Sequence, residues 1–446
     1  MQKAELIPTE RHLLRHASEN PAKTALIVGG ESVSYASLAA MVRRRASEII
    51  PDTPGRTRVF RASASVDFFV EYFATHLAGK VAVPLEKDAP DELFRTVSAL
   101  VTDTELPGNA YDILFTTGTT GRSKGVIVGE TANAANADNL IHGLGFHDRL
   151  TFVVSGPLNH IGSLSKIHPT ITAGGTVSVV DGMRDLAAFF GALENVPHTS
   201  ATFLVPASIR MILQLAPEQI GALASKIEFI ETGAAPMPLC DMQALSRLLP
   251  HSRLFNTYAS TETGVISTFN YNEGEAIAGC VGRPMRHSQV ELTPDGFIVC
   301  RGLTLMDGYV GDPEATQSIL YDGAIHTRDF ARLNSDGLLM MLGRNDDVIN
   351  TGGYKVSPVE VEDAAMGVDG IADCLCVPVE HPVSGHALKL LVVPSDPASP
   401  PAPREIAQAL RTRLESYKIP LRYEYVDSIA RTFNGKPDRK RYCYKL

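Results

Sequence analysis

Three apolar, strand-like runs alternate with helix-like runs in the middle of the chain, and this alternation constrains the fold more than any other feature. The strand-like runs are residues 203–206, 227–232 and 253–258. The segments between them, residues 207–215 and 237–249, place apolar side chains at helical spacing. Strands joined through helices form a parallel sheet with right-handed crossovers. The pattern therefore predicts an α/β fold.

Residues 346–446 follow a different pattern. Ser357 stands at the expected N-cap of a short helix. Residues 373–380 and 387–394 alternate between apolar and polar side chains, as two paired strands do. We therefore expect a smaller α+β domain over residues 346–446, behind a larger α/β body of several subdomains over residues 1–345.

Composition excludes several classes of protein. The chain has 446 residues, a formal net charge of −9 and six cysteines. The acidic balance argues against a dedicated nucleic-acid binder, and so few cysteines form no disulfide framework. No apolar run reaches the roughly 18 residues that a membrane span needs, and the N-terminus lacks the apolar stretch of a signal peptide. These properties predict a cytoplasmic enzyme without a nucleic-acid partner and without a membrane span.

A segment rich in threonine and glycine follows a predicted strand within residues 113–128. It contains Thr116, Thr117, Gly118, Thr119, Thr120 and Gly121, followed by Lys124. Glycines let the backbone approach a polyanion, hydroxyls and amides donate hydrogen bonds, and lysine adds positive charge. The segment does not match the pattern of a Walker A loop. We interpret it as a phosphate-binding loop, with a flexible connector as the alternative.

Four further segments carry groups suited to a site for a polyanion and a metal ion. Their key residues are Thr261 and Glu262, then Asp329, Arg344 and Lys436. A carboxylate that attacks a phosphate meets charge repulsion, which cations, Mg²⁺ and hydrogen-bond donors must neutralise. A vicinal diol suits a single bidentate carboxylate, which Asp329 could supply.

In this order, the five segments resemble the AMP-forming adenylating family, which includes acyl- and aryl-CoA synthetases, adenylation domains of peptide synthetases, and luciferases. The resemblance extends from residue 21 to Lys436, and the early phosphate loop is similar to that of compact members such as o-succinylbenzoate-CoA ligases. It implies ATP, Mg²⁺ and CoA as cofactors, a carboxylic acid as substrate and a mobile C-terminal domain. An acyl carrier protein is the alternative acceptor, and a non-catalytic nucleotide-binding protein is the alternative class. Dimers are common in this family, which makes a homodimer a candidate assembly.

The resemblance also implies roles for the phosphate-binding and metal-binding residues. The loop from Thr116 to Gly121, with Lys124, would hold the β- and γ-phosphates of ATP. Thr261 would contact the α-phosphate, and Glu262 would help to hold Mg²⁺ on the phosphates.

The remaining roles concern the nucleoside, the acyl group and the moving domain. Asp329 and Arg344 would hold the ribose, and Tyr258 would stack near the adenine. Residues along the adenine and the acyl group would be Gly233, Ala234 and Ala235. The hinge, the pantetheine tunnel and the mobile catalytic cation would be supplied by Asp346, Gly353 and Lys436, respectively.

Residues 156–168 resemble the segment at the mouth of the acyl pocket, where His160 would gate or orient the substrate carboxylate. The segment lacks the aspartate with which relatives bind an amino group, so we expect an aryl, fatty or other simple carboxylic acid. Lys166, His168 and Arg210 could serve a second substrate carboxylate, but we expect each to extend from its helix to water.

Two further sequence features carry predictions about the C-terminal domain. Cys374 and Cys376 share one face of a predicted strand, and we expect buried thiols there instead of metal ligands. The last sixteen residues carry six basic groups, which either form a solvated end or meet the phosphates of CoA.

Overall fold

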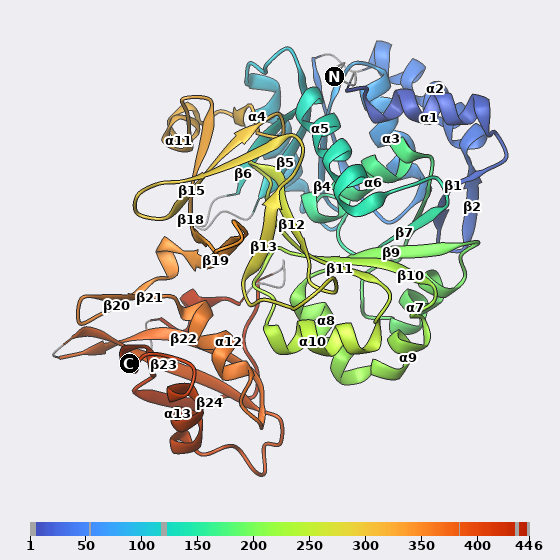
Figure 1. The fold of residues 1–446 in the computed structure, drawn as a ribbon. Coiled ribbons are helices and arrows are strands. Elements are labelled where there is room, and N and C mark those ends of the chain that lie inside the picture. The colour runs from blue at the N-terminus through green and yellow to red at the C-terminus, as the bar shows by residue number, and fades with distance from the viewer. Residues whose placement is uncertain (1–5, 53–54, 117–122, 383, 433–436, 444–446) are drawn as a thin grey trace.

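The computed structural model describes residues 6–52, 55–116, 123–382, 384–432 and 437–443. Within them, a large mixed sheet crosses the body of the protein (Figure 1). In order, its strands are β14 (Ser288–Leu292), β15 (Phe297–Gly302), β18 (Ala324–Leu333), β19 (Leu339–Arg344), β13 (Cys280–Pro284), β12 (Gly264–Asn270), β11 (Arg253–Ser260), β10 (Ile227–Thr232), β9 (Thr199–Leu204), β7 (Leu150–Val154), β8 (Thr176–Val179), β1 (Thr24–Val28) and β2 (Glu31–Ser34), with β17 (Leu320–Tyr321) paired to β18.

The middle of this sheet is parallel, as the alternating pattern predicts. Strands β8, β7, β9, β10 and β11 run parallel to one another. The helices between these strands are α6 (Ile161–Ala173), α7 (Leu186–Glu194), α8 (Pro206–Leu215), α9 (Pro217–Ala222) and α10 (Leu239–Leu248). The α/β fold class and the strands expected at 227–232 and 253–258 are therefore confirmed.

The strand expected at 203–206 is wrong in its bounds. Strand β9 already ends at Leu204, and Pro206 is the first residue of α8. Proline suits the first helical position, where a missing N–H costs nothing. The apolar run therefore straddles a strand end and a helix start.

A second sheet carries the predicted phosphate loop. Its order is β16 (Gly308–Tyr309), β6 (Lys124–Gly129), β5 (Ala110–Thr116), β4 (Val81–Glu86) and β3 (Thr57–Ala62). The helices of the body not yet named are α1 (Thr9–Glu19), α2 (Tyr35–Asp52), α3 (Val66–Leu77), α4 (Asp91–Asp103), α5 (Glu130–Leu140), the π-helix η1 (Ile141–Gly145) and α11 (Pro313–Ile319). A hydrophobic cluster that includes Leu26, Phe73, Leu114, Phe152 and Ile171 packs the two sheets and these helices together, except that α4 packs through Val97 and Val101 into a separate cluster.

The C-terminal part forms an α+β unit with a hydrophobic cluster of its own. Its elements are the 3₁₀-helix η2 (Asn345–Asp347), β20 (Ile349–Thr351), β21 (Tyr354–Val356), α12 (Pro358–Met366), β22 (Ile371–His381), β23 (Gly385–Pro394), α13 (Pro403–Arg411), η3 (Ser416–Lys418), β24 (Arg422–Tyr425) and η4 (Arg439–Arg441). Ser357 caps α12 by accepting a hydrogen bond from the backbone N–H of Glu360. The domain boundary at 345/346 stays a prediction.

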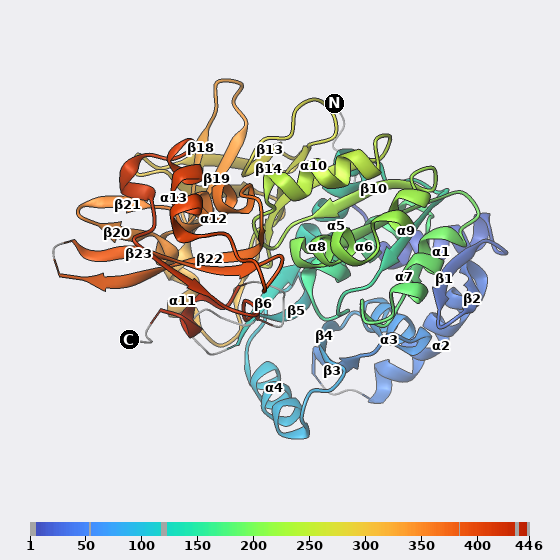
Figure 2. The same ribbon diagram turned by 90° about the horizontal axis from the view of Figure 1, so that it is seen from below.

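Figure 2 shows this C-terminal domain on one side of the molecule, with β22 facing α8 of the body. Within the described residues, no helix is both long and apolar enough to cross a membrane. The cytoplasmic location and the homodimer stay predictions.

Candidate active site

The segment after β10 turns sharply away from the sheet beside its neighbour β11. The two strands are parallel, and a β-carbon on Gly233 would lie only 2.9 Å from the carbonyl oxygen of Thr257. A side chain at this position would therefore collide with the backbone of β11. Ala234 follows with a φ of 70°, a conformation that residues other than glycine seldom adopt. The start of the turn thus lies against the strand that carries Tyr258.

Tyr258, Asp329 and Arg344, which are predicted to contact the nucleoside, lie together in the structure. The Tyr258 hydroxyl donates a hydrogen bond of 2.7 Å to Oδ2 of Asp329, and Nε of Arg344 lies 3.3 Å from Oδ1 of the same carboxylate. Asp329 and Arg344 are directly paired in the register of β18 and β19. Burial, followed by the charge of Asp329, raises the pKa of Tyr258 well above its usual value. The phenol therefore remains a hydrogen-bond donor to Asp329.

The turn between β11 and β12 holds Thr261 and Glu262 at its tip. Hydroxyl-to-backbone hydrogen bonds close the turn in both directions: Thr263 N donates to Ser260 Oγ at 3.1 Å, and Ser260 N donates to Thr263 Oγ1 at 3.2 Å. Short polar side chains favour such turns because they replace backbone partners. These hydrogen bonds therefore fix the loop that carries Thr261 and Glu262.

Tyr309 connects this turn to Lys124, at the start of β6. No motif in the sequence indicated this contact. Its hydroxyl donates a hydrogen bond of 2.9 Å to Oε1 of Glu262, and Nζ of Lys124 lies 4.6 Å from its ring centroid. Burial and then the charge of Glu262 raise the pKa of the Tyr309 phenol, against the opposing charge of Arg344. A lone tyrosine after Asp-Gly gives no sequence signal for this contact, which depends on the pairing of β16 with β6.

The mouth of the predicted phosphate loop is a hairpin. Strands β5 and β6 are antiparallel, and Thr116 stands opposite Lys124 in their register. The Ser123 hydroxyl donates a hydrogen bond of 2.7 Å to the carbonyl oxygen of Thr116. The loop residues predicted to hold phosphates, Thr117, Gly118, Thr119, Thr120 and Gly121, lie outside the described residues.

Glu262, the residue predicted to bind a metal, offers a carboxylate oxygen that suits Mg²⁺. The Tyr309 hydroxyl occupies one oxygen of Glu262, and the second carboxylate oxygen is a hard donor of the kind that Mg²⁺ prefers. No cluster of three or more His, Cys, Asp or Glu side chains that could hold a metal occurs among the described residues. One carboxylate, substrate phosphates and water are the usual ligands of Mg²⁺ in such a setting. The donor set is therefore compatible with Mg²⁺ that arrives on a phosphate substrate.

His160 occupies the N-cap position of α6, where its carbonyl oxygen accepts the first hydrogen bonds of the helix. Burial lowers the pKa of its imidazole below the usual value, so the ring is neutral near pH 7. The next residue, Ile161, lines a small cavity that Thr261 and Gly264 also line. The segment around His160 therefore adjoins the Thr261 turn, and a neutral ring there could accept or donate a hydrogen bond.

Comparison with known proteins identifies the family. The family model described as "AMP-binding enzyme" matches residues 97–310, and the model of the "AMP-binding enzyme C-terminal domain" matches residues 360–436. The chain belongs to the AMP-binding enzyme family. The resemblance found in the sequence is thereby confirmed, and the two matches fall on the body and on the C-terminal domain.

Relatives and solved structures agree with this assignment. Feruloyl-CoA synthase of Amycolatopsis sp. is 29% identical, over 95% of this chain and 96% of its own length. ATP-bound MatB of Rhodopseudomonas palustris has a TM-score of 0.86 at 22% identity, covering 98% of this chain and 99% of that chain. The o-succinylbenzoate-CoA synthetase MenE of Bacillus subtilis, in complex with its acyl-adenylate, has a TM-score of 0.82 at 20% identity, covering 99% of both chains. The two structures show that the fold is that of adenylate-forming enzymes.

Within this AMP-binding enzyme, the expectation that Lys166 and His168 extend to water is wrong. Nζ of Lys166 lies 2.8 Å from Oε2 of Glu231, and the two side chains are only 2% and 1% exposed. His168 bonds Thr9 Oγ1 at 2.8 Å and Tyr72 Oη at 2.9 Å, and burial lowers its pKa to about 4. Helix α6 contacts both α1 and α5 as well as the sheet, so these positions have no side that faces water.

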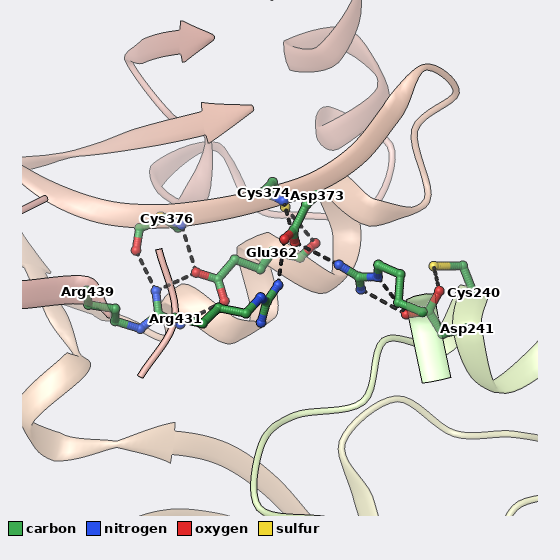
Figure 3. Close-up of polar contacts among 9 residues, drawn as sticks. Cys240, Asp241, Glu362, Asp373, Cys374, Cys376, Arg431 and Arg439 are labelled. Atoms are coloured by element: carbon green, nitrogen blue, oxygen red, sulfur yellow. Dashed lines mark hydrogen bonds and ion pairs between the residues drawn. The ribbon is translucent and has the colours of Figure 1, made fainter. Parts of the chain in front are cut away.

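Arg210 also does not extend to water. Its guanidinium is held between Asp241 and Asp373 (Figure 3).

Cys374 and Cys376 are buried thiols, as expected. Burial raises the pKa of each thiol above its usual value.

The described residues do not test the predicted roles of Gly353, Asp346 and Lys436. Gly353 lies in the exposed turn between β20 and β21 of the C-terminal domain, with a φ of +88°. Asp346 belongs to η2, immediately after β19, but its side chain lies outside the described residues, as does all of Lys436. The roles of these residues stay predictions.

Proposed function

We propose that this AMP-binding enzyme is an AMP-forming carboxylic acid–CoA ligase. One observation carries the proposal: Lys124, Tyr309 and Glu262 form a chain of contacts beside the Tyr258–Asp329–Arg344 cluster. Residues suited to phosphates, a metal and a ribose thus meet at the end of β11. The feruloyl-CoA synthase relative, matched over almost its whole length, supports CoA as the acceptor and an aryl acid as one substrate class.

In the first step, an oxygen of the substrate carboxylate attacks the α-phosphorus of ATP. A carboxylate–phosphorus bond forms, and the bond to the pyrophosphate leaving group breaks. Mg²⁺, when bound, neutralises charge on the phosphates. Lys124 supplies positive charge at the loop mouth, Thr261 donates to the α-phosphate, and Glu262, whose carboxylate Tyr309 positions, would hold the metal. Asp329 orients the nucleoside through its ribose hydroxyls, while Tyr258 fixes that carboxylate.

In the second step, the CoA thiol loses its proton to water and its sulfur attacks the acyl carbonyl carbon. A thioester bond forms, and AMP leaves with the electron pair of the broken anhydride bond. The C-terminal domain turns about Asp346 between the two steps and brings the turn with Gly353 to the pantetheine. Lys436 serves the first step only.

The substrate that this site favours is a simple carboxylic acid with one carboxylate. Lys166 is neutralised by Glu231 within 3 Å, and Arg210 is neutralised by two aspartates, so neither offers a free cation to a second carboxylate. We propose aryl and fatty acids as the classes to test.

Product analysis tests the function directly. The protein is incubated with MgATP and a panel of aryl, fatty and dicarboxylic acids, with CoA, with a holo-carrier protein, or with neither. We expect pyrophosphate release with at least one monocarboxylic acid, and its thioester with CoA. A thioester on the carrier protein alone would reassign the acceptor. No pyrophosphate release with any acid would instead indicate a non-catalytic nucleotide-binding protein.

Glu262→Gln tests the metal ligand. The amide keeps the size of the side chain but removes the charge that holds Mg²⁺, so we expect adenylation to fall at least roughly tenfold. Excess Mg²⁺ should restore part of the activity. The comparison variant Tyr309→Phe keeps the carboxylate and removes only its hydrogen bond, so its Mg²⁺ requirement should rise less. Unchanged kinetics of Glu262→Gln at limiting Mg²⁺ would remove Glu262 from the site.

A further inference from the structure

Tyr309 stands between two groups of opposite charge. Its hydroxyl donates a hydrogen bond of 2.9 Å to Oε1 of Glu262, and Nζ of Lys124 lies 4.6 Å from the centroid of its ring. Both charged side chains are half-buried. Within the part of the chain that the structure describes, no ion pair joins Lys124 to Glu262. One tyrosine side chain therefore separates the cation from the carboxylate.

Backbone hydrogen bonds fix Tyr309 in this place. On one side, the N–H of Val310 donates to the carbonyl oxygen of Gly125, which follows the lysine in β6, at 2.8 Å. On the other side, the N–H of Met306 donates to the carbonyl oxygen of Glu262, also at 2.8 Å. The segment that carries the tyrosine is thus bonded to both neighbours, and the ring between them is only 9% exposed.

Two other lysines of the described residues lie over aromatic rings, and both pair directly with a glutamate. Lys166 lies 5.3 Å from the ring centroid of Phe203 and 2.8 Å from Oε2 of Glu231. Lys418 lies 5.7 Å from the ring centroid of the tyrosine before it and 2.7 Å from Oε1 of Glu360. In neither case does the ring hold the carboxylate. At the predicted phosphate site, by contrast, the ring that lies under the lysine also binds the glutamate through its hydroxyl.

We infer that Tyr309 is a positioning residue that keeps Lys124 and Glu262 apart, so that the cation remains available to the phosphates and the carboxylate to the metal. The inference rests on the proposed function, which gives the two groups these roles. Opposite charges in a partly buried setting attract strongly, because solvent screens them less there. Without the tyrosine, Lys124 and Glu262 would neutralise one another, and ATP would have to break that pair in order to bind.

Equilibrium binding of ATP in EDTA, without acid or CoA, separates the role of the cation from that of the metal. Lys124→Met should weaken this binding by about tenfold, as expected for the loss of a charge-assisted hydrogen bond. Tyr309→Leu should weaken it by a similar factor although the lysine is still present, because the released Glu262 pairs with that lysine. The double variant Lys124→Met/Tyr309→Leu should bind no more weakly than the weaker single variant.

A double-mutant cycle distinguishes this role from a merely structural one. Glu262→Gln removes a negative charge near the phosphates, so it should raise the metal-free affinity by about twofold while Tyr309 is present. In the Tyr309→Leu background the same substitution also releases Lys124, so the gain should be at least about tenfold. If leucine only changes the shape of the site, the two gains will be equal.

Two conservative variants complete the test. Tyr309→Phe keeps the ring but frees Glu262 to turn towards Lys124, so it should show a smaller coupling of the same sign, and it takes the place of Tyr309→Leu in the cycle if the leucine variant does not fold. Tyr111→Phe is the matched control, since it removes a buried tyrosine–carboxylate hydrogen bond of 2.8 Å to Oε2 of Glu10. Its metal-free affinity should stay within about twofold. Urea unfolding of each variant checks that it is folded.

Equal gains from Glu262→Gln in the two backgrounds would overturn the inference. The absence of metal-free binding that depends on Lys124 would also overturn it. If the unmodified protein binds no ATP, with or without Mg²⁺, the proposed function itself is wrong. Metal-free binding that depends on Lys124, together with equal gains, refutes only the role of Tyr309.

Discussion

Lys436→Ala is expected to lower the rate of adenylate formation by about 10²–10³-fold, the usual effect of removing one group that stabilises developing charge. A cation between the carboxylate and the α-phosphate lowers their repulsion most while the two anions approach, so it favours the transition state over the ground state. Attack of CoA on supplied acyl-adenylate should be spared, because in the proposed mechanism Lys436 leaves the site before that step. Both half-reactions are measured on one folded preparation.

Lys440→Ala is the matched control for this variant. Lys440 is an exposed lysine of the same basic tail, and its loss should leave adenylate formation, a step without CoA, within about twofold, as expected for an exposed charge. Full adenylation activity in Lys436→Ala would mean that Lys436, like Lys440, has no role in adenylate formation. Equal damage to both steps would contradict the two-arrangement mechanism.

Lys166→Met is expected to lower the free energy of unfolding by about 3–5 kcal/mol. The substitution leaves the Glu231 carboxylate charged, fully buried and without its cation, while the methionine fills most of the vacated volume. Denaturation by urea measures the effect. The double variant Lys166→Met/Glu231→Leu should recover much of the loss, because apolar residues of similar volume often replace a buried ion pair at little cost.

Lys87→Met provides the comparison for an exposed pair. Lys87 and Asp181 lie 2.8 Å apart with side chains that are 48% and 71% exposed, so the loss of this pair should shift the unfolding midpoint little. If Lys166→Met lowers the free energy of unfolding no more than Lys87→Met does, the buried pair does not stabilise the fold as expected.

Local patterns predicted most of the fold because they report local physics. The apolar run before Gly233 predicts β10, and the capped start at Ser357 predicts α12, since each depends on neighbours in sequence. The strand expected at 203–206 failed because apolar character does not distinguish a strand end from a helix that begins at Pro206. Motif order also predicted that Asp329 and Arg344 belong to one site, and the register of β18 and β19 pairs them.

The sequence patterns did not predict contacts between segments that are far apart along the chain. The water-seeking behaviour expected of Lys166 assumes a helix with one exposed side, whereas α6 is covered by other helices and by the sheet. Its partner Glu231 lies in an apolar strand, and nothing in the neighbouring sequence indicated that this carboxylate is buried. Tyr309 meets Glu262 only because β16 pairs with β6, and Arg210 meets Asp373 only because two domains dock. Each of these contacts is set by tertiary packing.

Exchange of labelled pyrophosphate into ATP, measured without CoA, tests the central claim most directly. A separable adenylate step makes pyrophosphate release reversible while the acyl-adenylate stays bound, so the label should enter ATP whenever a productive acid and Mg²⁺ are present. Omission of the acid should abolish the exchange. The account predicts acid-dependent exchange that does not require CoA. Thioester formation with a productive acid, together with no exchange until CoA is added, would contradict it.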